Sequence, residues 1–138
     1  GWACWKTYVG RSETNWTRCK SLGIIGNAFC VSSAHEEALP VLKVYLALIR
    51  RYWPHDENNI LNVQTNISNI LSRLGRPDET LVIRREIFAR RVAMRGVSDE
   101  TTISNGYNLS ISLNEVGLRE EARTLVRDQL LPAARRSL

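Results

Sequence analysis

The sequence is poor in the residues that build metal centres and disulfide frameworks. It has two histidines and three cysteines among 138 residues. The spacings of Cys4, Cys19 and Cys30 match neither a zinc knuckle nor a disulfide framework. We therefore expect no metal and no cofactor. An odd number of cysteines favours a reducing intracellular compartment, either cytoplasmic or organellar.

Long apolar runs and catalytic motifs are also missing. No apolar stretch approaches the ~20 residues that a membrane-spanning helix needs, so no transmembrane span is predicted. The sequence contains no nucleophile elbow, phosphate loop or Ser–His–Asp order. The adjacent acids Glu36-Glu37 and Glu120-Glu121 fall where helices are predicted to begin, and acids there interact favourably with the helix dipole. The sequence thus predicts a protein that is not an enzyme.

The charge balance is moderately basic. Nineteen Lys and Arg against fourteen Asp and Glu give a net charge of +5. Many of the basic residues fall on predicted helix faces or last turns, where solvation accounts for them: Arg50, Arg51, Arg84, Arg85, Arg90, Arg91, Arg135 and Arg136. This scatter favours a protein or peptide partner over nucleic acid, which requires a basic patch aimed at phosphates.

A repeat of 42 residues runs through the chain. It is clearest where two helices of a pair meet, since three dipeptides recur there: Glu37-Ala38, Glu79-Thr80 and Glu121-Ala122. Apolar residues recur in the same register and are predicted to be buried: Ile25, Ile67 and Leu109; Phe29, Leu71 and Leu113; Val41, Ile83 and Leu125; Leu46, Phe88 and Leu130. Small residues recur at Gly26, Ser68 and Ser110, where two helices are expected to approach closely.

Within each repeat the spacing is helical. Between Ala38 and Tyr52 apolar residues follow i, i+3, i+4 and i+7 spacing, which places them on one helix face. Asp56 and Ser98 suit N-caps, and glycines at 75 and 117 suit left-handed helix ends. Helices are predicted at residues 14–32, 35–53, 57–74, 77–95, 99–116 and 119–136. Short connections make neighbours antiparallel, so the sequence predicts an all-α fold, a right-handed α-solenoid of about three antiparallel helix pairs.

At these residues the chain resembles a known family, the tetratricopeptide repeats (TPR), in the 42-residue variety found in kinesin light chains. The last repeat carries most of the resemblance, at Gly96, Asp99-Glu100-Thr101-Thr102, Asn108-Leu109-Ser110, Gly117 and Glu121-Ala122-Arg123. The middle repeat matches at Asn66-Ile67-Ser68, Gly75 and Glu79. It departs at Thr80, where the family favours alanine, and at Pro54 in place of a loop glycine. The first repeat keeps Leu22, Gly26, Asn27, Phe29, Glu37 and Ala38, with Ser33 in place of the turn glycine.

The resemblance implies that the first helix of each pair lines an inner groove. It maps groove-facing positions onto eight polar residues: Lys20, Asn27, Asn62, Asn66, Asn69, Arg73, Asn108 and Asn114. An asparagine amide both donates and accepts hydrogen bonds, so it can hold the backbone of an extended peptide. These asparagines could instead cap or bridge neighbouring helices. Groove contact is favoured for Asn66 and Asn108, which share a repeat position.

Residues 1–13 are predicted to form an aromatic segment ahead of a helical-repeat domain at 14–138. The aromatic residues at this end are Trp2, Trp5, Tyr8 and Trp16. Burial of several aromatic rings is favourable, so we expect this segment either to cap the first helix pair or to dock into a partner. Capping is favoured, because the ends of a solenoid need covering.

Two functions fit these observations. The favoured one is a non-catalytic scaffold that binds a peptide segment or a partner subunit through the surfaces of the helical repeat. The alternative is an accessory subunit that is built permanently into a larger multiprotein complex, such as an organellar one. About three repeats is near the minimum for a stable stack, which favours the alternative.

The behaviour of the isolated chain distinguishes these two functions. Residues 1–138 expressed alone and examined by size-exclusion chromatography are expected to be monodisperse if the chain is a scaffold. Aggregation that only co-expression with a partner relieves would favour the accessory subunit.

Overall fold

The computed structural model describes residues 20–26, 28 and 34–137. The aromatic segment 1–13 and the start of the first predicted helix lie outside the described residues. So do Trp2, Trp5, Tyr8, Trp16, Asn27 and Phe29. No helix among the described residues is long and apolar enough to cross a membrane.

Helices account for all the regular secondary structure of the described residues. Residues 20–26 are helical and are followed by α3 (His35–Tyr52), α4 (Glu57–Arg73), α5 (Pro77–Arg95), α6 (Glu100–Glu115), α7 (Arg119–Leu125), the π-helix η1 (Val126–Leu130) and α8 (Leu131–Arg136). From residue 35 onward the predicted helix ends are confirmed to within one residue. The π-helix inside the last helix was not predicted.

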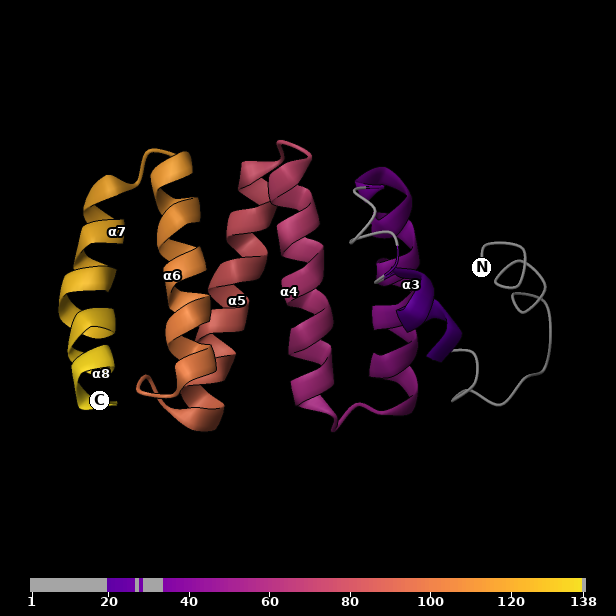
Figure 1. Ribbon diagram of the computed structural model, residues 1–138, viewed down its shortest axis with the longest axis horizontal. Helices are drawn as coiled ribbons and strands as arrows, with labels where there is room; N and C mark the ends of the chain where they lie inside the picture. The colour runs from indigo at the N-terminus through magenta and orange to yellow at the C-terminus, as the bar shows by residue number, and fades with distance from the viewer. Residues whose placement is uncertain (1–19, 27, 29–33, 138) are drawn as a thin grey trace. The chain divides into compact units, whose positions relative to one another are not determined.

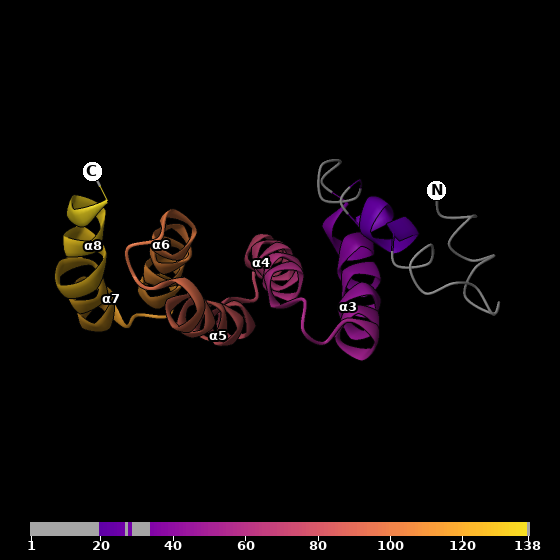
Figure 2. The ribbon, with the colours of Figure 1, turned by 90° about the horizontal axis from the view of Figure 1, so that it is seen from below.

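The chain divides into two compact units, residues 1–74 and residues 75–138. The first unit contains the helix at 20–26, α3 and α4, and the second contains α5, α6 and the continuous α7–η1–α8 helix. In the first unit α3 and α4 are antiparallel and joined by a short turn, and the same holds for successive helices of the second unit (Figure 1). In the second unit α6 packs against both α5 and α7, and Figure 2 shows it between them. The boundary falls inside the second predicted repeat.

The helix ends follow ordinary capping chemistry. Asp56 caps α4 as predicted, because its carboxylate accepts a hydrogen bond from the Asn59 amide at 3.3 Å. The prediction of Ser98 as the cap of α6 is wrong by one residue, since Asp99 accepts from the Thr102 amide at 3.2 Å. Gly75 and Gly117 have φ of 71° and 86°, which confirms the predicted left-handed helix ends.

The 42-residue register predicts burial well. Most of its described apolar positions are buried: Ile25, Ile67, Leu109, Leu71, Leu113, Val41, Leu125, Phe88 and Leu130. Ile83 and Leu46 are half-buried, so the prediction is too strong for them. Thr80, where the family has alanine, is fully buried, and its hydroxyl donates to the Arg76 carbonyl at 2.8 Å. A polar side chain is therefore tolerated there because its hydrogen bond is made within its own helix.

The recurring small residues lie where the register places them. Gly26, Ser68 and Ser110 are all buried. A methyl group on Gly26 would lie 2.5 Å from Cδ2 of Leu42 in α3, too close for any real contact. Ser68 and Ser110 each donate to the carbonyl three residues earlier, at 2.8 Å and 2.7 Å. The two serines therefore remain compact and satisfy their own hydroxyls.

Two arginines that the sequence places on solvated faces are buried. Arg84 and Arg91 are 7% and 2% exposed. Nη1 of Arg84 donates to the Ser112 hydroxyl at 2.7 Å and to the Asn108 carbonyl at 3.2 Å. Desolvation lowers the pKa of Arg84, with a smaller opposing effect from Glu115. Arg84 thus ties α5 to α6 through polar contacts inside the interface.

The π-helix changes the register of the last helix. The Leu131 amide donates to the Val126 carbonyl five residues earlier, which accommodates one additional residue in the turn. Phe88 and Leu130, predicted to be equivalent, both point at Gly106: a methyl group there would lie 2.9 Å from Phe88 Cε2 and 2.4 Å from Leu130 Cδ2. Leu130 therefore faces back towards α5 and α6. The next residue, Leu131, is 47% exposed.

Gly106 gives a test of this close packing. We expect Gly106→Leu to lower the free energy of unfolding by about 1–3 kcal/mol or more, because Phe88 and Leu130 must both move and overpacking outweighs the gain in helix propensity. Urea unfolding followed by circular dichroism measures this. Ser104→Leu, at an exposed position of the same helix, should leave stability nearly unchanged. Equal stability of the two variants would contradict the close packing of Phe88 and Leu130 against Gly106.

Candidate functional site

One face of α4 carries four of the predicted groove residues. Asn62, Asn66, Asn69 and Arg73 are spaced by four, three and four residues, so they follow one another along the helix. Asn66 and Asn69 are half-buried, whereas Asn62 and Arg73 are exposed. Asn66, Asn69 and Arg73 line a hollow of about 150 Å³ together with Ile70 and His35. The structure therefore brings three of the eight predicted residues into one small site, called the α4 hollow below.

His35, at the start of α3, is the member of the α4 hollow that sequence reasoning missed. Its Nδ1 is buried and has no hydrogen-bond partner among the described residues. A buried ring nitrogen of this kind is costly to leave unpaired. His35 lies 31 residues before Asn66, so no local sequence pattern connects them. The two residues are brought together by the packing of α3 on α4.

The α4 hollow combines three kinds of polar group around one apolar side chain. The amides of Asn66 and Asn69 can each donate and accept, and the imidazole of His35 can do either depending on its tautomer. Arg73 contributes a guanidinium, which pairs with carboxylates through two parallel hydrogen bonds. Ile70 supplies an apolar contact. This set can bind peptide amides and a carboxylate.

The other predicted groove residues lie elsewhere. Lys20 is exposed on the helix at 20–26. In the second unit Asn108 is half-buried, and its main-chain carbonyl accepts from Arg84. Asn114 is exposed and lines a hollow together with residues of α7, η1 and α8. Asn108 does not line this hollow.

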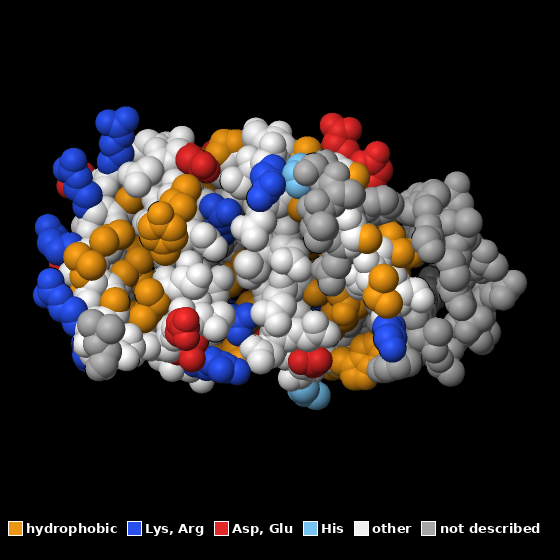
Figure 3. Space-filling view, viewed as in Figure 1, with side chains coloured by type: hydrophobic (Ala, Val, Ile, Leu, Met, Phe, Trp, Pro, Cys, Tyr) orange, Lys and Arg blue, Asp and Glu red, His pale blue; other side chains and the backbone are white. Residues whose placement is uncertain are grey.

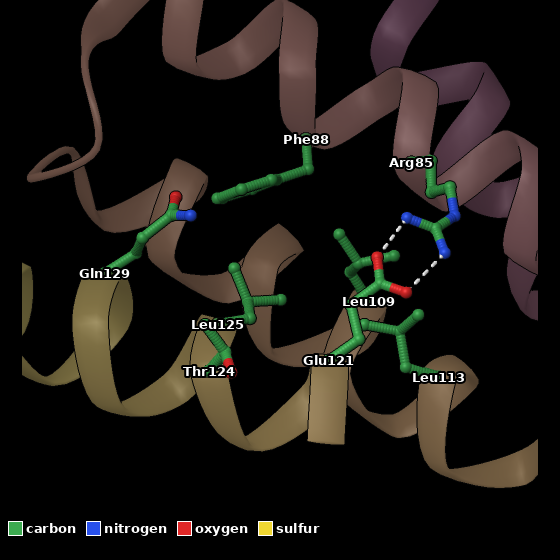
Figure 4. A pocket seen from close by; sticks show the side chains of 8 residues that line it. All are labelled: Arg85, Phe88, Leu109, Leu113, Glu121, Thr124, Leu125 and Gln129. Carbon is green, nitrogen blue, oxygen red and sulfur yellow. Dashed lines mark hydrogen bonds and ion pairs between the residues drawn. The ribbon is translucent and has the colours of Figure 1, made fainter. Parts of the chain in front are cut away.

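A larger hollow of about 420 Å³ lies between the helices of the second unit (Figure 4). Its lining comes from all three helices: Arg85 and Phe88 of α5, Leu109 and Leu113 of α6, Glu121, Thr124 and Leu125 of α7, and Gln129 of η1. Figure 4 shows the guanidinium of Arg85 and the carboxylate of Glu121 directed at each other. They form two hydrogen bonds, one of them from Nη2 to Oε2 at 2.9 Å.

The Arg85–Glu121 pair shifts both groups towards their charged forms. The hydrogen bond from Arg85 lowers the pKa of Glu121, and the same bond raises the pKa of Arg85. The side chains are 44% and 46% exposed, so solvent screens much of the attraction. The sequence placed Arg85 on a solvated face and Glu121 in a helix-dipole role, because the partners lie 36 residues apart.

A third hollow, of about 390 Å³, lies between the end of α6 and the α7–η1–α8 helix. Asn114, Ala122, Arg123, Val126, Arg127 and Leu131 line it. Arg123 pairs with Glu120 at 2.8 Å, and Arg127 pairs with Asp128 at 2.8 Å. Figure 3 shows hydrophobic side chains over α6 and α7–α8, with basic side chains along the outer edge of α7–α8. We call this hollow and the side chains that line it the end face.

In the part of the chain that the structure describes, no group of three or more His, Cys, Asp or Glu side chains could hold a metal ion. Glu120 and Glu121, which are adjacent in sequence, pair with different arginines, Arg123 and Arg85.

The Arg85–Glu121 pair predicts a pH dependence of stability. The folded-state pKa of Glu121 lies below its ordinary value of 4.5, so the pair stabilises the fold above that pH, and the contribution is lost as the pH falls through the folded pKa. Glu121→Gln should therefore lower stability at pH 7 by less than about 1 kcal/mol. The difference from the unaltered chain should shrink as the pH is lowered from 7 to below 4.5. Thermal melts across this range measure it, with Glu86→Gln as a control that removes a longer, 3.6 Å pair. A difference in stability that stays constant as the pH is lowered would contradict the assignment.

Comparison with known proteins supports the fold. No family model and no curated protein sequence matches the chain. Among solved structures, the chain is similar to a single-residue variant of a Podosopora anserina protein with nearly identical TPR-like repeats, provisionally described as a kinesin light chain. The TM-score is 0.70 at 17% sequence identity, and the match covers 89% of this chain and 57% of that one. The chain therefore has the TPR-like helical-repeat fold that its 42-residue register predicts.

Proposed function

We propose that the chain is a non-catalytic scaffold that binds a peptide segment of a partner protein at the α4 hollow. The observation that carries this proposal is the gathering of Asn66, Asn69, Arg73 and His35 around one hollow. These residues come from two helices, and one of them has a buried ring nitrogen with no partner among the described residues. A ligand with amide and carboxylate groups matches the chemistry of this set, and it could pair with the ring nitrogen of His35.

The size of the α4 hollow favours a peptide over a drug-sized small molecule. Sites for such molecules usually enclose about 300–1,000 Å³. The α4 hollow encloses about 150 Å³, enough for one side chain or a carboxylate group. An extended peptide could place one residue there while the rest of it runs along α4, past the exposed amide of Asn62.

The TPR-like fold adds support, since helical-repeat stacks present extended surfaces to partners. The solved neighbour is itself described by its TPR-like repeats and provisionally as a kinesin light chain. Its likeness to this chain supports a role in protein interaction in general terms and names no partner. A docking role for Trp2, Trp5, Tyr8 and Trp16 remains a prediction.

A second candidate function is an accessory subunit within a larger complex. The observation that favours it is the exposure of large apolar side chains in both units. Ile24 is 61% exposed, Val82 67% and Tyr107 61%. Single exposed apolar residues are common on monomers, so this observation weighs less than the α4 hollow.

Selection followed by mutation tests the peptide proposal. A phage-displayed library of random peptides is selected on the full chain, and selected peptides are titrated by fluorescence anisotropy. We expect Asn66→Ala and Arg73→Ala each to weaken binding by about tenfold, because each removes a hydrogen bond made to the ligand, one of them charged. Raising the salt concentration should weaken binding to the unaltered chain more than to Arg73→Ala.

Two matched substitutions control for general effects. Asn58→Ala removes an amide near the start of α4, and Arg50→Ala removes a guanidinium from α3, and both positions are exposed and outside the α4 hollow. Both variants should bind as the unaltered chain does. If the selected peptides bind all four variants with equal affinity, the proposal that they bind at the α4 hollow is wrong.

A further inference from the structure

The second unit shows how one helix of this chain receives the next helix pair. The face of α5 that meets α6 and α7 carries two apolar and two basic residues: Leu81, Arg84, Arg85 and Phe88. Phe88 packs into a cluster with Leu109 and Leu113 of α6. Arg85 binds the carboxylate of Glu121 in α7. Apolar contact in the middle and an ion pair at the edge therefore hold the α6–α7 pair in place.

The end face lies at the equivalent positions one repeat later, where one basic and one apolar residue have changed places. Arg123, Val126 and Arg127 lie 42 residues after Leu81, Arg84 and Arg85. Because of the additional residue in η1, the counterpart of Phe88 is Leu131, 43 residues later, while Leu130 turns inward towards Gly106. The end face thus also presents two basic and two apolar side chains. In contrast to Phe88, which is 8% exposed, Leu131 is 47% exposed.

The counterpart of Arg85 on the end face is Arg127, and it keeps capacity for a second carboxylate. Its guanidinium is bonded to Asp128, its neighbour in sequence, and the two side chains are 72% and 51% exposed. An exposed pair of this kind contributes little to stability. A guanidinium has five N–H donors, so Arg127 can donate to a carboxylate of a partner while it keeps contact with Asp128.

We propose that the end face binds an amphipathic helical segment of a partner protein, one that carries a glutamate at its edge and leucine-type side chains at its centre. The chemistry of the occupant follows from the α6–α7 pair, which supplies Glu121 to Arg85 and two leucines to Phe88. The partner's glutamate binds Arg127, and its leucines cover Leu131 and Val126. The end face shares no residue with the α4 hollow, so this proposal is independent of the proposed function.

The chain itself provides the probe for a test. A fluorescently labelled synthetic peptide of residues 99–125 contains the α6–α7 pair with Leu109, Leu113 and Glu121. We expect it to bind the full chain in anisotropy titrations. Arg127→Glu in the chain should weaken binding by at least about tenfold, because it replaces attraction by repulsion. A peptide with Glu121→Arg should bind the unaltered chain weakly and regain binding to the Arg127→Glu chain.

Three further measurements keep the result unambiguous. Leu131→Asp, at an exposed position, should also weaken binding without loss of helical circular dichroism. Arg90→Glu makes the same charge change on α5 outside the end face and should leave binding unchanged. Binding that is insensitive to Arg127→Glu, or a charge swap that restores nothing, would overturn the proposal. So would dimerisation of the chain by sedimentation velocity that Arg127→Glu abolishes, because the occupant would then be a second copy.

Discussion

The architecture of each unit depends on close contact between its consecutive helices, because no single helix can bury its apolar face alone. Where the helices cross, the side chains are small or absent: Gly26 against Leu42, and Gly106 between Phe88 and Leu130. At these points the backbone of one helix meets the side chains of the next, and the volume of even one methyl group matters. The leucine-rich cluster of the second unit forms around that contact. The larger hollow of the second unit is lined by residues of that same cluster.

Two different kinds of surface result from this packing. In the first unit the contact of α3 with α4 brings a histidine beside two asparagines and an arginine, which gives a polar hollow. In the second unit the helices enclose leucines and a phenylalanine, and an ion pair lies at the edge of that hollow. A single repeat pattern therefore forms two hollows of different chemistry, one lined mainly by polar side chains and one that also exposes leucines and a phenylalanine.

The sequence predicts the local structure well, because local structure here has local causes. Helix ends coincide with Asp56, with the left-handed glycines Gly75 and Gly117, and with a period of apolar residues that only a helix satisfies. The face of α4 was also predictable, since the spacing of its asparagines fixes their direction. What the sequence could not show depends on contacts between residues distant in the chain. His35 joins the α4 hollow, Arg84 lies beneath α6, and Arg85 finds Glu121 only once the helices pack. The π-helix escaped prediction because its residues suit an ordinary helix equally well.

The buried guanidinium of Arg84 also affects how the chain behaves while it is being synthesised. The ribosome releases α5 before α6 exists to cover it, so for some seconds the future interface faces water. While α6 is absent, the hydrated guanidinium of Arg84 makes this exposed surface less prone to hydrophobic association than a leucine would. Once α6 arrives, Ser112 and the Asn108 carbonyl accept two hydrogen bonds from Nη1 of Arg84 in place of water. A hydrophobic residue in place of Arg84 would raise the stability of the folded chain, yet it would leave the nascent chain more prone to aggregate.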